Sequence, residues 1–171
     1  MDSHNEDGPK KITFNGTNTK YQMKKVSGLQ SNIPKVRVGW KEDMLLDQPS
    51  QLQLLVSKDT RLSKDIITKL NGYRNQDSLK NRLDTQTFIT PQQTIDLLVQ
   101  TNLTCFYCKC FTPILYKNVR DGNQWSLDRI DNDKGHSFDN VVISCLKCNL
   151  QKKRRSSDTF AMSKQMILTR V

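Results

Sequence analysis

The chain has 171 residues and a formal net charge of +10 at pH 7, with 35% hydrophobic and 7% aromatic residues. It contains no apolar run of about eighteen residues and no hydrophobic stretch near its start, so we expect neither a membrane span nor a secretory signal. We therefore expect an intracellular protein with a modest core. Its excess positive charge indicates a polyanionic partner, DNA in the first place, rather than a membrane or a small molecule.

The N-terminal part of the chain shows little regular patterning. Residues 1–30 are polar with no sustained apolar period, which predicts a disordered basic tail. Residues 31–100 are predicted to be a mainly helical region of unknown role. Within it, residues 33–40 alternate briefly, as in a strand or an extended arm, and residues 42–56 are interrupted by Pro49. A proline inside this segment predicts at best two short helical pieces.

Three helices are expected between residues 59 and 103. The first follows an apolar stripe up to Leu70 and ends at Asn71–Gly72, a pair typical of a helix C-cap, and a second short helix is predicted over residues 76–83. The third begins at Thr90, followed by a proline at the first helical position and a glutamine that completes a capping box. Its buried side is predicted to contain Ile95, Leu97, Leu98 and Leu103.

Five cysteines in a chain without an export signal favour metal-binding thiols over disulfides. Cys105 and Cys108 form one Cys-x-x-Cys pair, and Cys145 and Cys148 form another. Such a turn lets both sulfurs face one ion, and four thiolates make a closed structural zinc site with no open position for water. The fifth cysteine, Cys110, could replace Cys108 as a ligand, although we prefer to interpret it as a small buried thiol.

The segment between the two cysteine pairs has the pattern of a hairpin. Residues 125–131 alternate around Leu127 and Ile130, residues 132–135 have turn composition, and residues 141–144 are a compact β-branched run. The sequence LKCNLQKKRR, which follows Cys145, predicts a basic helix. The expected order is therefore strand, strand, helix.

This stretch, WSLDRIDNDKGHSFDNVVISCLKCNLQKKRR, together with the upstream CFYC, resembles the HNH (His-Me finger) endonucleases. It is most similar to their zinc-stapled subgroup, of the phage endonuclease VII type, and to HNH proteins of large DNA viruses. The resemblance covers roughly residues 103–155. It implies an α+β protein in which the helical N-terminal region is followed, over residues 101–171, by a zinc-stapled ββα-metal finger and a C-terminal helix. It also implies hydrolysis of phosphodiester bonds in DNA with Mg²⁺ or Mn²⁺, beside the structural Zn²⁺.

The resemblance assigns roles to individual residues. Asp128 and Asn149 match the two ligands of the catalytic metal, and their carboxylate and amide oxygens suit Mg²⁺. Asn140 matches the asparagine that holds the loop and orients the general base. Arg129 stands where the family usually has the histidine that acts as general base. A guanidinium cannot accept a proton at neutral pH, so we expect Arg129 to bind the phosphate instead.

The proton acceptor would then come from elsewhere in the chain, or the site would be inactive. We favour His136, in the hairpin loop, over Asp131, and a purely structural His136 remains open. Without an acceptor the module would be a non-catalytic zinc finger that binds nucleic acid. A third possibility is an interaction protein that uses the finger only as a scaffold.

Positive charge is concentrated after the second cysteine pair. Residues 101–171 carry a net +6, against +4 in the longer segment 1–100. A finger helix of this kind lies against the nucleic-acid backbone, so its basic side chains are expected to neutralise phosphates without reading bases. The alternative is a solvated face or a localisation signal. The predicted phosphate contacts are Lys147, Lys152, Lys153, Arg154 and Arg155.

Overall fold

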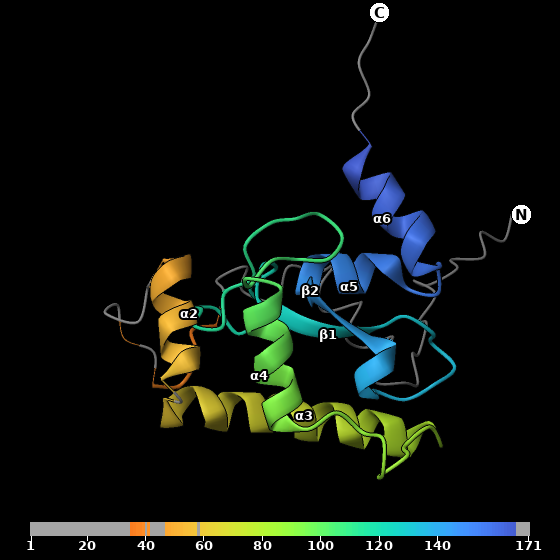
Figure 1. The fold of residues 1–171 in the computed structure, drawn as a ribbon, viewed down its shortest axis with the longest axis horizontal. Helices are drawn as coiled ribbons and strands as arrows, with labels where there is room; N and C mark the ends of the chain where they lie inside the picture. Colours follow the sequence, from red (N-terminus) through yellow and green to blue (C-terminus); the bar gives the residue numbers. More distant parts are fainter. Residues whose placement is uncertain (1–34, 40, 42–46, 58, 167–171) are drawn as a thin grey trace, which may run out of the picture. The chain divides into compact units, whose positions relative to one another are not determined.

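The computed structural model describes residues 35–39, 41, 47–57 and 59–166, and the predicted tail at 1–30 lies outside them. In these ranges helices surround a two-stranded antiparallel sheet, which makes the fold α+β (Figure 1). No helix there is long and apolar enough to cross a bilayer. The elements are α2 (Gln48–Val56), α3 (Thr60–Leu79), α4 (Pro91–Gln100), β1 (Trp125–Arg129), the 3-10 turn η2 (Phe138–Asn140), β2 (Val141–Cys145), α5 (Leu146–Lys152) and α6 (Ser157–Gln165).

Helix α3 is one continuous helix of 20 residues, where the sequence predicted a break at Asn71–Gly72 and a separate helix over 76–83. The prediction is wrong because the buried side continues past the break, and packing over this length outweighs the roughly 1 kcal/mol that a helical glycine costs. The helix ends at Leu79 instead, and Asn81, just past its C-cap Lys80, has a left-handed φ of 53°. The buried residues of α3 are Leu62, Ile66, Leu70 and Asp77.

Pro49 marks the start of the helix before α3. Helix α2 is capped by Asp47, and Pro49 lies in its first turn, where the missing N–H costs no hydrogen bond. One short helical piece is thus present, as α2, and the piece expected before Pro49 falls mainly on residues 42–46, which lie outside the described ranges. Of the predicted strand or arm at 33–40, the structure describes residues 35–39, which form one isolated bridge, between Val36 and Asn118.

Helix α4 begins as predicted. Thr90 accepts a hydrogen bond from the Gln93 N–H while the Gln93 side chain accepts one from the Thr90 N–H, and Pro91 occupies the first turn. This capping box fixes the helix start by local chemistry alone. Of the predicted buried side, Leu98 and Leu103 are fully buried, and Ile95 and Leu97 are partly buried against the same core.

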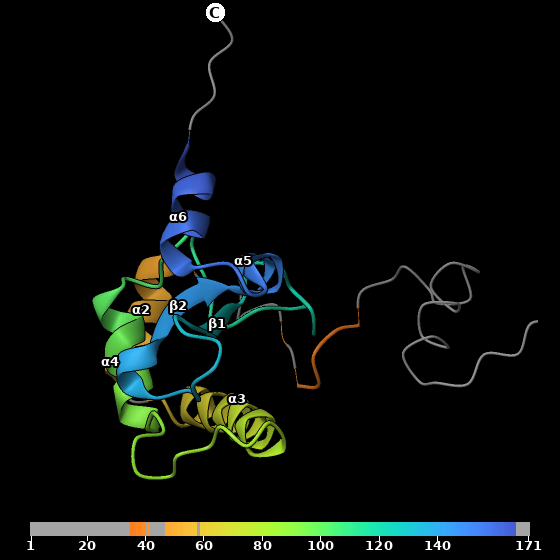
Figure 2. The ribbon, with the colours of Figure 1, turned by 90° about the vertical axis from the view of Figure 1, so that its right-hand side faces the viewer.

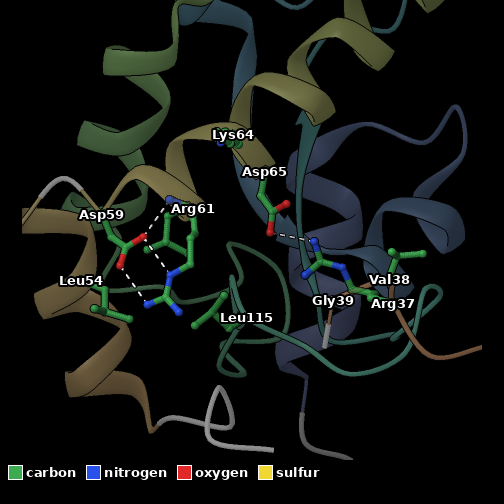
Figure 3. Close-up of a pocket in the computed structure, with 10 residues that line it drawn as sticks. Arg37, Val38, Gly39, Leu54, Asp59, Arg61, Lys64, Asp65 and Leu115 are labelled. Atoms are coloured by element: carbon green, nitrogen blue, oxygen red, sulfur yellow. Dashed lines mark hydrogen bonds and ion pairs between the residues drawn. The ribbon is translucent and has the colours of Figure 1, made fainter. Parts of the chain in front are cut away.

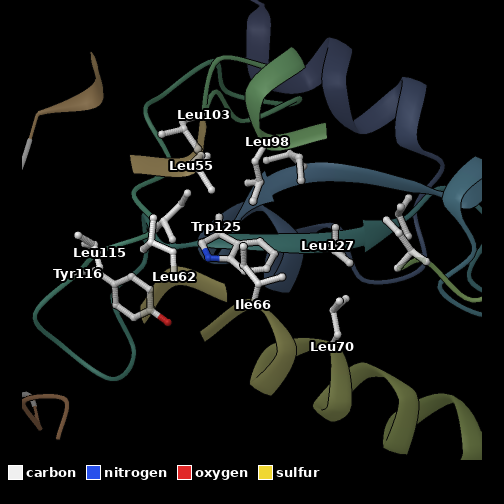
Figure 4. Packing of buried hydrophobic residues seen from close by; sticks show 14 of the residues in the cluster. Leu55, Leu62, Ile66, Leu70, Leu98, Leu103, Leu115, Tyr116, Trp125 and Leu127 are labelled. Carbon is white, nitrogen blue, oxygen red and sulfur yellow. The ribbon is translucent and has the colours of Figure 1, made fainter. Parts of the chain in front are cut away.

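The predicted hairpin is confirmed: β1 and β2 pair antiparallel, with Trp125 opposite Cys145 and Arg129 opposite Val141. Alternate strand residues face opposite sides of a sheet. Trp125 and Leu127 face the main core, among side chains of α3 and α4 (Figure 4). Asp128 faces the other side, where a second cluster contains Cys105, Tyr107, Cys145, Cys148 and Phe160. In both views α3 and α5 lie on opposite sides of the hairpin (Figures 1 and 2).

Side chains from α3 and α5 cover the outer edge of β1. The Leu127 N–H donates to the Tyr73 hydroxyl at 3.1 Å, and the Leu127 carbonyl accepts from Asn149 Nδ2 at 3.0 Å. The Lys69 and Lys152 ammonium groups donate to the carbonyls of Trp125 and Arg129, respectively. These bonds satisfy backbone N–H and C=O groups on the outer edge of β1, which would otherwise be open to pairing with another chain. They also place Asn149 and Lys152 beside β1.

Candidate functional site

The four predicted zinc cysteines converge. The sulfur atoms of Cys105, Cys108, Cys145 and Cys148 all lie within 4.8 Å of one another. Three of these side chains are buried and Cys108 is partly exposed. Four sulfurs at this separation can share one tetrahedral ion, so the cluster is compatible with a structural zinc.

Local backbone structure aims both cysteine pairs. In the first pair, the Cys105 N–H donates to the Cys110 carbonyl at 2.9 Å, and the Lys109 N–H donates to the Cys105 carbonyl at 3.0 Å. In the second pair, Cys145 is the N-cap of α5, and its sulfur accepts a hydrogen bond from the Cys148 N–H at 3.4 Å. The second pair therefore sits at the junction of β2 and α5, the point where hairpin and helix meet.

Two of the four thiols have raised pKa values in the absence of a cation. The neighbouring Cys145 sulfur and burial raise the pKa of Cys105 to about 12, and burial raises the pKa of Cys148 to about 12. Four thiolates this close repel one another, and a dication among them removes that penalty. The arrangement is therefore compatible with a bound metal ion, whose charge would offset that repulsion.

Cys110 lies beside the cluster but outside the group of four. Its sulfur is 3.3 Å from that of Cys108, and the side chain is partly buried. The structure thus agrees with a small, partly buried thiol. It also places Cys110 next to Cys108, the ligand that Cys110 could replace.

Asp128 is 5% exposed and is held through one oxygen. Its Oδ2 accepts a hydrogen bond from the Tyr107 hydroxyl at 2.6 Å and lies 3.4 Å from Lys152 Nζ. Burial raises the pKa of Asp128, and the contacts with Tyr107 and Lys152 partly offset that shift. Among the described residues, no hydrogen bond to Oδ1 of Asp128 is present.

Lys152 is not the surface residue that the sequence predicted. It is 0% exposed, donates to the Arg129 carbonyl at 2.5 Å and pairs with Asp128. The prediction of a phosphate contact is therefore wrong for this lysine. Helical spacing explains the error, because Lys152 follows Asn149 by three residues and so shares its face of α5, against β1.

The other basic residues of this run are exposed. Lys147, Lys153 and Arg154 reach solvent, and Arg154 is 81% exposed. Arg155 is exposed too, although its guanidinium lies 4.5 Å from the Phe160 ring centre and donates to the Gln151 carbonyl. Their contact with phosphates stays a prediction.

Two asparagines hold the hairpin. Asn149 Nδ2 donates to the Leu127 carbonyl and, at 3.2 Å, to the Ser126 hydroxyl. No described residue donates to its Oδ1. Asn140 is buried and ties the loop: its Oδ1 accepts from the Asp131 N–H at 2.9 Å, and its Nδ2 donates to the carbonyls of Asp131 and Gly135.

Arg129 is turned into the hairpin loop rather than toward solvent. Its guanidinium donates to the carbonyls of Asn132 and Lys134, at 3.2 and 3.0 Å, and lies 3.9 Å from Asp77 Oδ1. The side chain is only 13% exposed. Arg129 therefore braces the loop against α3, in place of the free phosphate contact that we expected.

His136 lies against α3. Asp77 Oδ2 accepts hydrogen bonds from the His136 backbone N–H at 2.7 Å and from its Nδ1 at 2.9 Å, and the ring centre is 4.6 Å from that of Tyr73. The structure does not bring this imidazole into contact with Asp128, whose partners lie on the α5 side. Asp131, the alternative base, is exposed and accepts the Asp133 N–H.

Two residues of the site were missed from the sequence. Tyr107 stands inside the first Cys-x-x-Cys pair, so its position beside the cysteines was a usable signal. Asp77 continues the buried stripe of α3, seven residues after Leu70, and a carboxylate on an apolar stripe indicates a buried partner. The wrongly predicted helix break hid that signal.

The burial of His136 predicts a pH effect on stability. Burial lowers the pKa of His136 below its usual 6.5, so the unfolded chain binds the proton more tightly than the folded one. The free energy of unfolding should therefore fall as the pH drops below about 6.5 and stop falling once the folded histidine also takes up its proton. Urea unfolding between about pH 5.5 and 7.5 measures this. A His136→Gln variant should have a shallower slope than the wild type, and an unchanged slope would contradict the assignment.

A separate pocket lies between α3 and the segment around Arg37 (Figure 3). Arg37 pairs with Asp65 at 2.7 Å on one side, and Asp59 pairs with Arg61 at 3.0 Å on the other. None of the residues predicted for the metal or catalytic sites lines it. This pocket therefore plays no part in the candidate site.

Comparison with known proteins finds a relative for part of this chain. A protein of Acanthamoeba polyphaga mimivirus, described as uncharacterized, is 37% identical over 73 residues, which cover 43% of this chain and 12% of that protein. No protein-family model matches the chain. No solved structure matches it either. The chain thus has a viral relative, of whose length it spans only a small part.

Proposed function

We propose that this protein is a metal-dependent endonuclease that hydrolyses phosphodiester bonds in DNA through a zinc-stapled ββα finger of the HNH type. The order of β1, β2 and α5, with one cysteine pair at the junction of strand and helix, supports this proposal. The quoted motif and the net charge of +10 support a DNA substrate.

One observation carries the proposal. Asp128 and Asn149 are each fixed through one polar atom, while no described residue donates to the Oδ1 of either. Asp128 contacts Lys152 of α5, and Asn149 of α5 contacts the Leu127 carbonyl at the outer edge of β1. A carboxylate oxygen and an amide oxygen suit a Mg²⁺ ion that keeps its remaining waters. When bound, such an ion polarises the scissile phosphate and stabilises the leaving oxygen.

The chain's own contacts prepare Asp128 for this role. The Lys152 ammonium favours the ionised carboxylate, and the Tyr107 hydroxyl fixes its direction. Asn149 is directed in the same way by the backbone of β1. Orientation of a metal ligand by its neighbours is a general requirement of such sites.

A second candidate is non-catalytic binding of nucleic acid by the same zinc module. One observation favours it: no described contact joins His136 or Asp131 to Asp128 or Asn149, and Arg129 is used within the loop. A general base must reach the proton that it abstracts. If the protein only binds nucleic acid, Asp128 serves to balance the charge of Lys152.

A cleavage assay separates the two functions. Zinc-loaded protein is incubated with linear, supercoiled and four-way-junction DNA, with Mg²⁺, with Mn²⁺ and without either. The endonuclease proposal expects products that need the added metal and that disappear with Asp128→Asn, at unchanged zinc content. Binding without products under any of these conditions supports the second candidate instead.

A further inference from the structure

Two arginines from distant parts of the sequence meet at one carboxylate oxygen. Arg82 Nη2 and Arg154 Nη2 lie 3.3 and 3.4 Å from Oδ1 of Asp133, at the tip of the hairpin. Asp133 is 71% exposed. Each guanidinium carries five N–H donors in a fixed fork, and Asp133 is the one described hydrogen-bond partner of either fork. The pair therefore has donors to spare for a larger anion.

The loop and the end of α3 hold Arg82 in place. A Cβ at Gly135 would lie 2.4 Å from the Arg82 carbonyl oxygen, so only glycine allows the loop to approach the backbone this closely. The Arg82 N–H donates to the Asp77 carbonyl at 2.8 Å. The loop itself is tied by Asn140 and braced by Arg129. The backbone that carries Arg82 and Asp133 is thus fixed before any ligand arrives.

The turn after α5 fixes the position of Arg154. Lys153 adopts a left-handed φ of 54°, which turns the chain out of the helix. The Arg155 N–H then donates to the Lys152 carbonyl at 3.1 Å, and the Arg155 side chain packs on Phe160. Arg154, between Lys153 and Arg155, therefore lies exposed at the surface.

We propose that Arg82 and Arg154 form a phosphate clamp across the hairpin tip, and that Asp133 stands in for an oxygen of a nucleic-acid phosphodiester. The inference rests on the nucleic-acid partner of the proposed function but not on cleavage. A phosphodiester offers each arginine its own non-bridging oxygen, whereas both arginines contact the same oxygen of Asp133. The exposed Lys80, Lys134 and Lys153 lie on the same three segments and extend the positive surface. The helical N-terminal region therefore contributes to binding through Arg82.

The clamp predicts an unusual sign for one substitution. Asp133→Asn removes a competitor and should tighten binding of a labelled duplex, measured by fluorescence anisotropy without Mg²⁺. Arg82→Ala and Arg154→Ala should each weaken binding and make the slope of log K against log salt shallower by about 0.9. Asp139→Asn is the matched control, because it removes the same charge from an exposed residue of the same loop, and no described arginine pairs with Asp139.

The outcomes separate this inference from the proposed function. Tighter binding by Asp133→Asn than by Asp139→Asn, with weaker binding by both arginine variants, establishes the clamp even if no DNA is cut. Equal effects of the two aspartate variants, or an unchanged salt slope in both arginine variants, would overturn it, whether or not the wild type cleaves. Binding of acidic peptides but not of the duplex would overturn it too.

Discussion

Replacing Cys145 by serine is expected to release the metal and unfold the C-terminal module. Cys145 supplies one of four sulfurs within 4.8 Å of one another, ends β2 and caps α5, so its loss affects the ion, the strand and the helix together. Structural zinc contributes roughly 10–16 kcal/mol of apparent binding energy in small zinc-finger peptides, more than most domains have in total stability. Elemental analysis and thermal unfolding by circular dichroism measure the two losses.

Cys110→Ser is the matched control for that experiment. Cys110 lies 3.3 Å from a ligand but outside the group of four, so this variant should keep one zinc per chain and its folded signal. Wild-type protein purified without chelators and free of zinc would contradict the site. A Cys145→Ser variant that unfolds at the wild-type temperature would contradict it as well.

Replacing Lys152 by methionine should destabilise the protein by about 3–5 kcal/mol, the usual cost of breaking a buried ion pair from one side. Lys152 is 0% exposed and Asp128 is 5% exposed, so the variant leaves a buried carboxylate without its compensating charge. The Arg129 carbonyl also loses its donor. Urea unfolding at neutral pH gives the difference in free energy.

The neighbouring lysine provides the control. Lys153 is exposed, and Lys153→Met should change stability by no more than about 0.5 kcal/mol. Adding Asp128→Asn to Lys152→Met should recover part of the loss, because the uncompensated charge disappears. Equal effects of the two lysine variants would show that Lys152 is a surface residue after all.

The parts of the fold that follow from local chemistry could be predicted from the sequence. The capping box at Thr90 uses only residues within one turn, and the hairpin follows from alternation, turn residues and a β-branched run. The cysteine pairs belong here too, because a Cys-x-x-Cys turn presents both sulfurs to one ion by its own geometry. In each case the decisive contacts lie close together in the chain.

The remaining features depend on contacts across the fold. Nothing in the run LQKKRR distinguishes the buried Lys152 from its exposed neighbours, since its burial follows from the packing of α5 on β1. Arg129 and His136 both turn toward Asp77, more than fifty residues away on α3. A misplaced helix end at Asn71–Gly72 left Asp77 outside the predicted stripe. The candidate metal ligands could therefore be named from the sequence, whereas the contacts of the candidate base, His136, could not.

Binding of Mn²⁺ to the zinc-loaded protein tests most directly whether hairpin and helix share a second metal ion. Titration followed by electron paramagnetic resonance should show one Mn²⁺ site per chain in the wild type. Asp128→Asn should weaken that site by at least tenfold, Asn149→Ala should weaken it as well, and the exposed Asp131→Asn should retain it, all with one zinc bound. A wild type that takes up no Mn²⁺, or an Asp128→Asn variant that binds it with wild-type affinity, would contradict a catalytic metal at Asp128 and Asn149.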